Sequence, residues 1–269
     1  MLKTIISSLW LKENLNDPDL IILDASQKGN KSGLKTDYEN IQLKGAKAFD
    51  IKNIFSDQSS EFPNTLLNPK EFETACQNLG INKTSKIIVY DNLGVYTSPR
   101  VWWMFKTMGH DAIAVLDGGL PDWVKQGFET EDVQTSKSEI GDFVANFQAQ
   151  KLVNFDFVKK NIPKQSYLVI DARSEGRFKG VIPEPREGLR GGNIPHSVNI
   201  PFQKVLNKGR FKTKTELIEL FQEVATRDKP LVFSCGSGIT ACIVLLAYEL
   251  YCEKETAVYD GSWTEWATL

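Results

Sequence analysis

Residues 230–244 read Pro-Leu-Val-Phe-Ser-Cys-Gly-Ser-Gly-Ile-Thr-Ala-Cys-Ile-Val, and this stretch decides the fold. Residues 231–233 form a short apolar run typical of a buried strand, and residues 239–250 form an apolar run of helical length. The segment between them, which begins at Cys235, is therefore predicted to be a tight turn from strand to helix. Its two glycines allow successive backbone N–H groups to converge on one point.

A cysteine in such a turn has two roles open to it. The converging amides and the positive end of the following helix would both favour a thiolate at Cys235, which makes this residue a candidate nucleophile. Unpaired cysteines are equally common as inert residues of a protein core. The turn alone leaves both interpretations open.

Length and charge narrow the class of protein. The chain has 269 residues, enough for two α/β domains of ordinary size, and its 41% hydrophobic and 25% charged residues are typical of a globular protein. A net charge of -2 argues against nucleic acid or an anionic membrane as a partner. Residues 1–25 lack the pattern of a signal peptide and no apolar run would span a membrane, so a cytoplasmic protein is expected.

Cysteine and histidine spacing shows no sign of a metal site. None of the four cysteines belongs to a CxxC pair, and the two histidines give no zinc-ligand spacing. We therefore expect no metal or organic cofactor, a reducing compartment, and one working thiol. The remaining three thiols are expected to be structural: Cys76, Cys242 and Cys252.

Four segments of the first half recur in the same order in the second half, which indicates an internal duplication. The matching segments are 19–26 with 166–174, 43–51 with 194–202, 86–91 with 230–235, and 116–123 with 259–266. The repeat is too long for a solenoid, so the chain is predicted to contain two copies of one domain.

Strands alternate with helices in each copy. Helix starts are marked by Asn68-Pro69 and by the Thr213 to Glu216 capping box. This alternation predicts two α/β domains, each with a mainly parallel sheet flanked by helices. The predicted boundaries are a first, non-catalytic copy at residues 1–130, a polar linker at 131–150, and a catalytic copy at 151–269.

The catalytic copy is the second because Asp91 takes the place of the cysteine in the first. Ligand sites of such folds usually lie beyond the carboxyl ends of the strands, and the Cys235 turn follows one of these ends.

Several motifs together resemble those of two-domain rhodanese-type sulfurtransferases. They are the Cys-Gly-Ser-Gly-Ile-Thr-Ala loop, the Gly176-Arg-Phe and Pro183-Glu-Pro-Arg motifs, and the closing Tyr-Asp-Gly-Ser-Trp-Thr-Glu-Trp of residues 259–266. Segments 98–105 and 116–120 extend the resemblance into the first half, so it covers nearly the whole chain. It implies tandem rhodanese-like domains and a sulfur atom carried on Cys235 as a persulfide.

Within this family, the loop is most similar to that of 3-mercaptopyruvate sulfurtransferases. Members that prefer thiosulfate tend to carry basic residues directly after the cysteine, where this chain has Gly236 and Ser237. The resemblance therefore implies transfer of sulfane sulfur from 3-mercaptopyruvate to thioredoxin, a small thiol or cyanide. A thiosulfate-preferring rhodanese remains the alternative, and an inactive rhodanese-fold module that binds a protein is an alternative of another class.

The resemblance also assigns roles around the loop. Arg177 and Arg186 match the family's substrate-binding arginines, although an ion pair with Glu175, Glu184 or Glu187 is the ordinary fate of such a residue. Ser237 is expected to assist Cys235 in catalysis or to cap the following helix. The rest of the loop is expected to bind substrate: Gly236, Gly238, Ile239 and Thr240.

The sequence departs from two patterns of catalytic residues, that of a histidine relay and that of a cysteine phosphatase. Many relatives have His-Ile-Pro-Gly in the first copy, whereas this chain has Gln42-Leu-Lys-Gly45, so a Ser/His/Asp relay would lack its histidine. Asp37 or Glu39 could take the place of the acidic member, and His196 and His110 are expected to be structural or solvated. A cysteine phosphatase also uses an amide-lined thiolate, but commonly needs an arginine in the loop, which is absent here.

Overall fold

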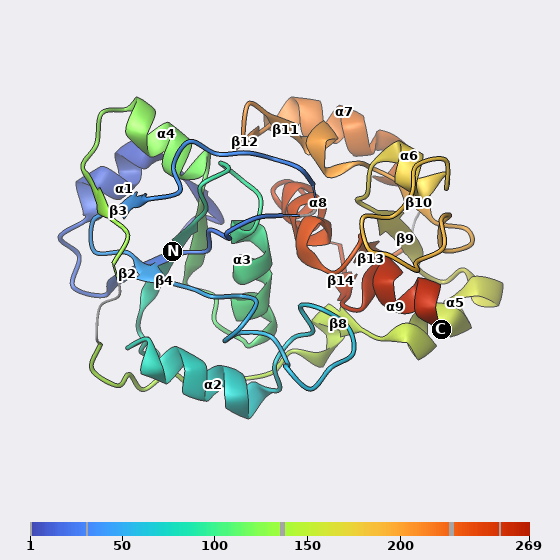
Figure 1. Cartoon of the computed structure of the whole chain (residues 1–269), viewed down its shortest axis with the longest axis horizontal. Helices are drawn as coiled ribbons and strands as arrows, with labels where there is room; N and C mark the ends of the chain where they lie inside the picture. The colour runs from blue at the N-terminus through green and yellow to red at the C-terminus, as the bar shows by residue number, and fades with distance from the viewer. Residues whose placement is uncertain (1, 31, 135–137, 226–228, 253) are drawn as a thin grey trace. The chain divides into compact units, whose positions relative to one another are not determined.

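The chain was analysed as a computed structural model, which describes residues 2–30, 32–134, 138–225, 229–252 and 254–269. It divides into two compact units (Figure 1). The first domain comprises Met1–Gln58, Leu66–Gln148 and Lys208–Arg210. The second domain comprises Ser59–Thr65, Ala149–Asn207 and Phe211–Leu269.

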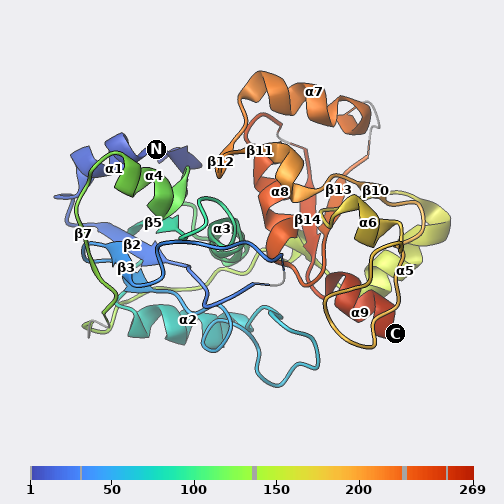
Figure 2. The same ribbon diagram turned by 45° about the horizontal axis from the view of Figure 1, so that its top comes forward.

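The first domain is built on a five-stranded sheet of order β1-β6-β5-β2-β4, in which every neighbouring pair is parallel. Its strands are β1 (Ile5–Ile6), β2 (Leu20–Asp24), β4 (Lys47–Ala48), β5 (Lys86–Tyr90) and β6 (Ile113–Leu116). Its helices are α1 (Ser8–Asn14), α2 (Pro69–Asn78), α3 (Ser98–Thr107) and α4 (Gly119–Lys125). Helices α1 and α4 lie side by side, as Figure 2 shows.

The second domain has a parallel five-stranded sheet of order β10-β9-β13-β14-β8. Its strands are β8 (Leu152–Val153), β9 (Leu168–Asp171), β10 (Val198–Asn199), β13 (Leu231–Ser234) and β14 (Thr256–Tyr259). Its helices are α5 (Phe155–Lys164), α6 (Glu175–Phe178), α7 (Lys214–Ala225), α8 (Ile239–Glu249) and α9 (Ser262–Thr268). Short elements complete the chain: 3-10 turns at Ala149–Lys151 and Phe202–Val205, and a small pair of strands, β11 (Leu206–Asn207) and β12 (Arg210–Phe211).

The two sheets have the same topology. Read from β8, the second sheet repeats the first, with β8, β14, β13, β9 and β10 in the places of β1, β6, β5, β2 and β4. The predicted duplication and the predicted parallel α/β fold are therefore confirmed. The quoted stretch forms β13, a turn and α8, as expected.

Helix α8 packs against β13 and β14, and its residues from Ile239 to Tyr248 are all buried, which explains why the sequence shows no polar face there. The predicted helix starts are also confirmed. The Asn68 side chain accepts hydrogen bonds from the N–H groups of Lys70 and Glu71, while Thr213 and Glu216 bond to each other across the first turn of α7.

Much of the segment expected to be a linker is bound to the first domain. Its first part forms β7 (Thr130–Asp132), which pairs antiparallel with β3 (Ile41–Leu43). Residues 135–137 lie outside the described residues. Farther on, Phe143 is buried among the rings of Phe72 and Phe105. This burial was not anticipated, because the short segment around Phe143 carries no periodic apolar pattern.

The turn after β5 contains a carboxylate surrounded by donors. Oδ2 of Asp91 accepts hydrogen bonds from the N–H groups of Tyr96, Thr97 and Ser98 at 2.8, 3.0 and 2.9 Å, and from the Ser98 hydroxyl at 2.7 Å. Oδ1 accepts the N–H of Leu93. The turn thus gathers its amides around an anion that belongs to the chain itself.

We expect Asp91→Asn to destabilise the protein by about 3 kcal/mol, because an amide N–H would then face converging donors. Chemical denaturation of both forms measures this change. The exposed Asp132→Asn variant is the matched control and should stay within about 0.5 kcal/mol of the original chain. Equal stability of all three proteins would contradict the assigned role.

The two histidines differ in burial. His110 is buried, and its Nε2 lies 2.9 Å from the carbonyl oxygen of Ser85, to which it donates. Burial lowers the pKa of His110 below its usual value. His196 is exposed. Burial of the ring therefore opposes protonation of His110 in the folded state.

Because the unfolded chain binds the His110 proton more readily than the folded one, folding stability should fall as the pH drops from about 6.5 towards the lowered pKa. His110→Gln should flatten this part of the stability curve, and His196→Asn should leave it unchanged. Denaturant midpoints measured from pH 7.5 to 5.5 test both expectations. A slope that follows His196 instead would refute the assignment.

Candidate active site

Three loops meet at the carboxyl edge of the second sheet. In the sheet register Ser234 lies opposite Asp171, and Phe233 lies opposite Val258, so β9, β13 and β14 end side by side. Cys235 follows β13 directly. The loops after β9 and β14 are therefore its neighbours, as expected for a parallel sheet.

The backbone of Cys235 is held by the start of α9. Its carbonyl accepts the N–H of Trp263 at 2.9 Å, and its own N–H donates to Oγ of Ser262 at 3.1 Å. Ser262 in turn donates to the carbonyl of Tyr259. Cys235 is only 2% exposed. The main chain of Cys235 is thus fixed by these contacts.

Gly236 is also held by the start of α9, and Gly238 forms the boundary of α8. The Gly236 carbonyl accepts both the N–H and the hydroxyl of Thr264, at 3.0 and 2.6 Å. Gly238 has φ of 79° and is the residue before α8, a conformation that favours glycine. No described side chain caps this helix. The expected capping role of Ser237 is therefore wrong, because Gly238 occupies the capping position.

The Ser237 hydroxyl is used as an acceptor. It accepts hydrogen bonds from Nη2 of Arg186 at 3.1 Å and from Nδ2 of Asn64 at 3.0 Å. Nδ2 of Asn64 also lies 3.1 Å from the Ser237 carbonyl. A hydroxyl oxygen has two acceptor positions and one proton, so Ser237 retains its proton for a third group.

Both predicted arginines lie beside Gly236. A Cβ atom at Gly236 would stand 2.9 Å from Nη2 of Arg177 and 3.9 Å from Nη1 of Arg186. Nη1 of Arg186 also donates to the hydroxyl of Thr264. The structure thus brings the two guanidinium groups to the loop that follows Cys235. A side chain at position 236 would displace one of them.

Arg177 also makes the ion pair that sequence reasoning offered as its alternative fate. Its Nε and Nη2 donate to the Glu184 carboxylate, with the shortest contact at 2.5 Å. The Glu184 side chain is 2% exposed. Arg177 therefore pairs with Glu184 and also lies beside Gly236 in the loop that follows Cys235.

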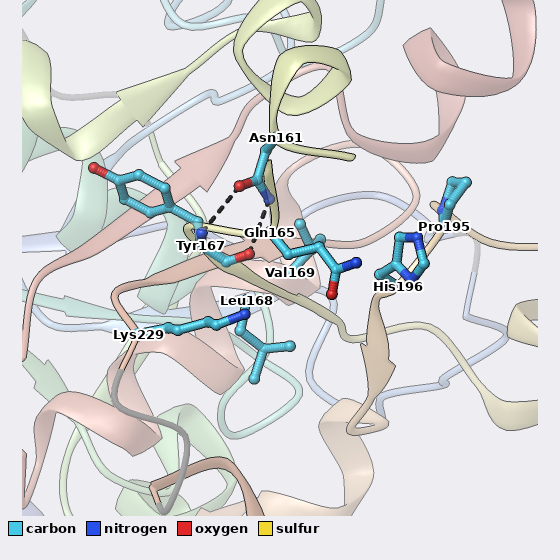
Figure 3. A pocket seen from close by; sticks show the side chains of 8 residues that line it. All are labelled: Asn161, Gln165, Tyr167, Leu168, Val169, Pro195, His196 and Lys229. Carbon is cyan, nitrogen blue, oxygen red and sulfur yellow. Dashed lines mark hydrogen bonds between the residues drawn. The ribbon is translucent and has the colours of Figure 1, made fainter. Parts of the chain in front are cut away.

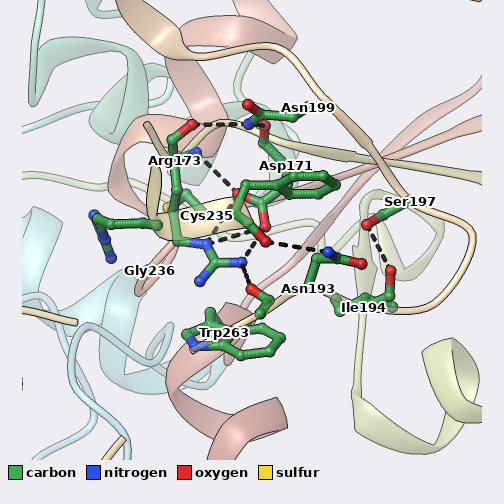
Figure 4. Close-up of polar contacts among 12 residues, drawn as sticks. Asp171, Arg173, Asn193, Ile194, Ser197, Asn199, Cys235, Gly236 and Trp263 are labelled. Carbon is green, nitrogen blue, oxygen red and sulfur yellow. Dashed lines mark hydrogen bonds and ion pairs between the residues drawn. The ribbon is translucent and has the colours of Figure 1, made fainter. Parts of the chain in front are cut away.

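A second arginine shares Glu184. Arg173 is fully buried, grips the Asp171 carboxylate through Nε and Nη2, and donates to Glu184 at 2.7 Å. Burial raises the pKa of Asp171, and Arg173 opposes this effect. The Arg173 guanidinium also stacks at 4.2 Å from the ring centroid of Trp263 (Figure 4). A buried charge network thus supports the floor of the site.

The remaining loop residues follow the expectation in part. Ile239 and Thr240 form the first turn of α8 and are buried. Cys242 lies in the core and its thiol contacts the Gly238 carbonyl, while Cys252 is half-buried beside Tyr248. Burial raises the pKa of the Cys76 thiol well above its usual value. Cys76 and Cys242 are thus buried, and Cys252 is partly accessible.

Gln42 and His196 each have neighbours within their own domain. Gln42 is buried and donates to the Ala46 carbonyl and to Glu131, which gives it a structural role in the first domain. His196 has φ of 64° and, with Gln165 and Lys229, lines a small cavity of about 30 Å³ beside the starting end of β9 (Figure 3). Cys235 follows the other end of the sheet. His196 and Cys235 therefore lie at opposite ends of the second sheet.

No group of three or more His, Cys, Asp and Glu side chains is placed to hold a metal ion in the part of the chain that the structure describes. Within the same residues, no helix has both the length and the apolar character needed to cross a membrane.

Sequence reasoning missed several residues of this site. Asn64 lies in a segment of the first half, and only the fold places residues 59–65 in the second domain. Thr264 and Ser262 were quoted only as part of a motif, although their pairing with the Cys235 loop fixes it. The repeat offered one signal for them, because the segment 259–266 matches 116–123.

Comparisons with known proteins agree with this architecture. A family model described as Rhodanese-like domain matches residues 7–126 and 154–269. The 3-mercaptopyruvate sulfurtransferase of Mus musculus is 37% identical over 276 residues, which cover 99% of this chain and 92% of that protein. The thiosulfate sulfurtransferase of the same organism is 36% identical over 275 residues, which cover 98% and 92%.

A solved structure gives the same result. The crystal structure of SseA from Escherichia coli, described as a 3-mercaptopyruvate sulfotransferase, is similar with a TM-score of 0.86 and 32% identity. The similarity covers 97% of this chain and 99% of SseA. The family match includes both halves, and the sheet order repeats in both. The chain therefore belongs to the rhodanese-like family and carries two copies of its domain.

Proposed function

We propose that this protein is a sulfurtransferase that moves sulfane sulfur from 3-mercaptopyruvate to a thiol or cyanide through a persulfide on Cys235. The observation that carries the proposal is the position of Gly236, which lies next to both guanidinium groups and directly follows the cysteine. Two cations and a thiol at one turn suit a small anion that carries sulfur. The named relatives support the same reaction class.

Substrate binding uses the arginine forks. A guanidinium group offers parallel N–H donors that match a carboxylate or the adjacent keto oxygen of an α-keto acid. Arg177 and Arg186 would hold these oxygens, and the thiol-bearing carbon would then reach the turn at Cys235.

The first half reaction forms one sulfur–sulfur bond. The Cys235 thiolate attacks the sulfur of 3-mercaptopyruvate, the carbon–sulfur bond breaks, and its electron pair leaves on carbon as the enolate of pyruvate. The proton of the substrate thiol balances the enolate, so the products are pyruvate and the Cys235 persulfide anion. Arg177 and Arg186 stabilise the charge on the enolate oxygen as it develops.

The persulfide needs a site for its negative outer sulfur. The N–H groups of residues 236–240 and the start of α8 would supply it, as the first-domain turn does for the Asp91 carboxylate. The Ser237 hydroxyl, whose oxygen is occupied by Arg186 and Asn64, would donate its proton to the sulfur. Catalysis then proceeds without a histidine.

In the second half reaction an acceptor thiolate attacks the outer sulfur, the sulfur–sulfur bond breaks, and Cys235 leaves as a thiolate. Thioredoxin, a small thiol or cyanide would serve as acceptor. Because the enzyme alternates between two covalent states, double-reciprocal plots should be parallel. The unbridged cysteines fit a reducing compartment such as the cytoplasm.

Thiosulfate is the second candidate donor. The chain is about equally identical to relatives named for each donor, so identity does not separate them. The loop favours 3-mercaptopyruvate, because Gly236 and Ser237 place no cation directly after Cys235. A dianion would benefit from such a cation more than a carboxylate would.

Incubation with 3-mercaptopyruvate should add the mass of one sulfur atom to the intact protein, and Cys235→Ser should abolish this gain. Intact-mass spectrometry measures both, with Cys252→Ser as a matched control that keeps the gain. A protein that gains no mass from either donor would support the inactive binding module. A gain that survives in Cys235→Ser would exclude the proposed nucleophile.

We expect Gly236→Ala to raise the KM for 3-mercaptopyruvate about tenfold, because its Cβ would stand 2.9 Å from Nη2 of Arg177. The backbone at Gly236 is not in the left-handed region, so the fold should tolerate alanine. Steady-state kinetics together with a thermal unfolding curve separate the two effects. An unchanged KM would show that Arg177 does not hold the donor.

A further inference from the structure

One buried charge near the site has no role in the mechanism described so far. The Glu184 carboxylate is 2% exposed and lies between two arginines, with Arg173 at 2.7 Å and Arg177 at 2.5 Å. Arg173 already has a bidentate partner in Asp171. Neutralising the charge of Arg173 therefore does not by itself explain why a second carboxylate, that of Glu184, is buried here.

The geometry shows which part of Arg177 this carboxylate occupies. Glu184 accepts from Nε and Nη2, which together form one edge of the guanidinium group. Among the residues that the structure describes, none accepts a hydrogen bond from Nη1 of Arg177. The edge formed by Nη1 and Nη2 therefore remains for a ligand, and Nη2 is the atom nearest to Gly236.

We propose that Glu184 determines donor specificity, by fixing the open edge of Arg177 and by offsetting its charge, so that the site prefers a singly charged carboxylate to dianionic thiosulfate. This inference rests on the proposed function, because it concerns Arg177, the residue proposed to bind the sulfur donor. Glu184 is a positioning residue, because it acts on the donor through Arg177.

The negative charge of Glu184, rather than the orientation that it gives Arg177, makes its effect differ between the two donors. A buried carboxylate a few ångströms behind Arg177 repels every anion bound in front of it, and the repulsion doubles for a dianion. Loss of orientation would weaken both donors alike. Loss of the negative charge should favour thiosulfate over 3-mercaptopyruvate. The ratio of the two specificity constants therefore separates the two effects.

Glu184→Gln should raise the ratio of kcat/KM for thiosulfate to kcat/KM for 3-mercaptopyruvate by about tenfold. Glu184→Asp keeps the charge and should leave the ratio near its original value, even if both constants fall. Glu175→Gln is the matched control, since Glu175 lies on the same short helix as Arg177, is exposed and pairs with Lys179. An equal loss for both donors in Glu184→Gln would overturn the proposal.

A binding measurement separates failure of this inference from failure of the proposed function. In the Cys235→Ser background, no sulfur transfer is possible, and thermal shifts with pyruvate and with sulfate report the binding of a monoanion and a dianion. Adding Glu184→Gln should increase the sulfate shift relative to the pyruvate shift. An unchanged ratio in a protein that still unfolds cooperatively would overturn the inference, whatever the turnover assays give.

Discussion

A backbone hydrogen bond between the last helix of each domain and the turn after its central strand supports the rest of the arrangement. In the second domain it joins the Trp263 N–H to the Cys235 carbonyl, and in the first domain the Leu120 N–H to the Asp91 carbonyl. Because this bond points the carbonyl towards the helix start, the amides that follow can face the other way, towards an anion. The turn is therefore shaped by its neighbour as much as by its own glycines.

The same helix start shows a difference between the copies. Gly119 and Ser262 occupy matching positions, and both have φ of 52°. The conformation is unfavourable for serine, yet the Ser262 hydroxyl accepts the N–H of Cys235. In the first copy, where the turn surrounds the Asp91 carboxylate, the matching position is occupied by Gly119. In the second copy the strained serine adds a further restraint on the backbone of Cys235.

The sequence predicted those parts of the structure that depend on local pattern. Apolar runs, capping residues and the internal repeat predicted two parallel α/β domains, and the turn at Cys235 follows from its glycines. The contribution of Asn64 could not be predicted in this way, because it depends on which domain a loop joins. Nor could the sharing of Glu184 between two arginines be predicted, since a carboxylate seven residues from Arg177 and eleven from Arg173 has several partners within reach.

The failed expectation for Ser237 has a comparable cause. Serine before an apolar helix is a common cap, but the glycine that follows it, with its left-handed backbone, takes over the boundary. The hydroxyl is then recruited by Arg186 and Asn64, which come from distant parts of the sequence. Local preference was overridden by tertiary contacts.

The Asp91 carboxylate of the first domain has a consequence for the stability of the matching turns in the two copies. Converging amides repel one another unless an anion lies among them. In the first copy Asp91 supplies that anion permanently, so the turn is equally stable at every stage of a reaction. Under the proposed mechanism the anion of the second copy is the persulfide or the thiolate of Cys235, so the free energy of the fold would be linked to the covalent state of one thiol. The proposed mechanism would thus combine a first copy that has a permanent anion with a second copy whose anion changes during each turnover.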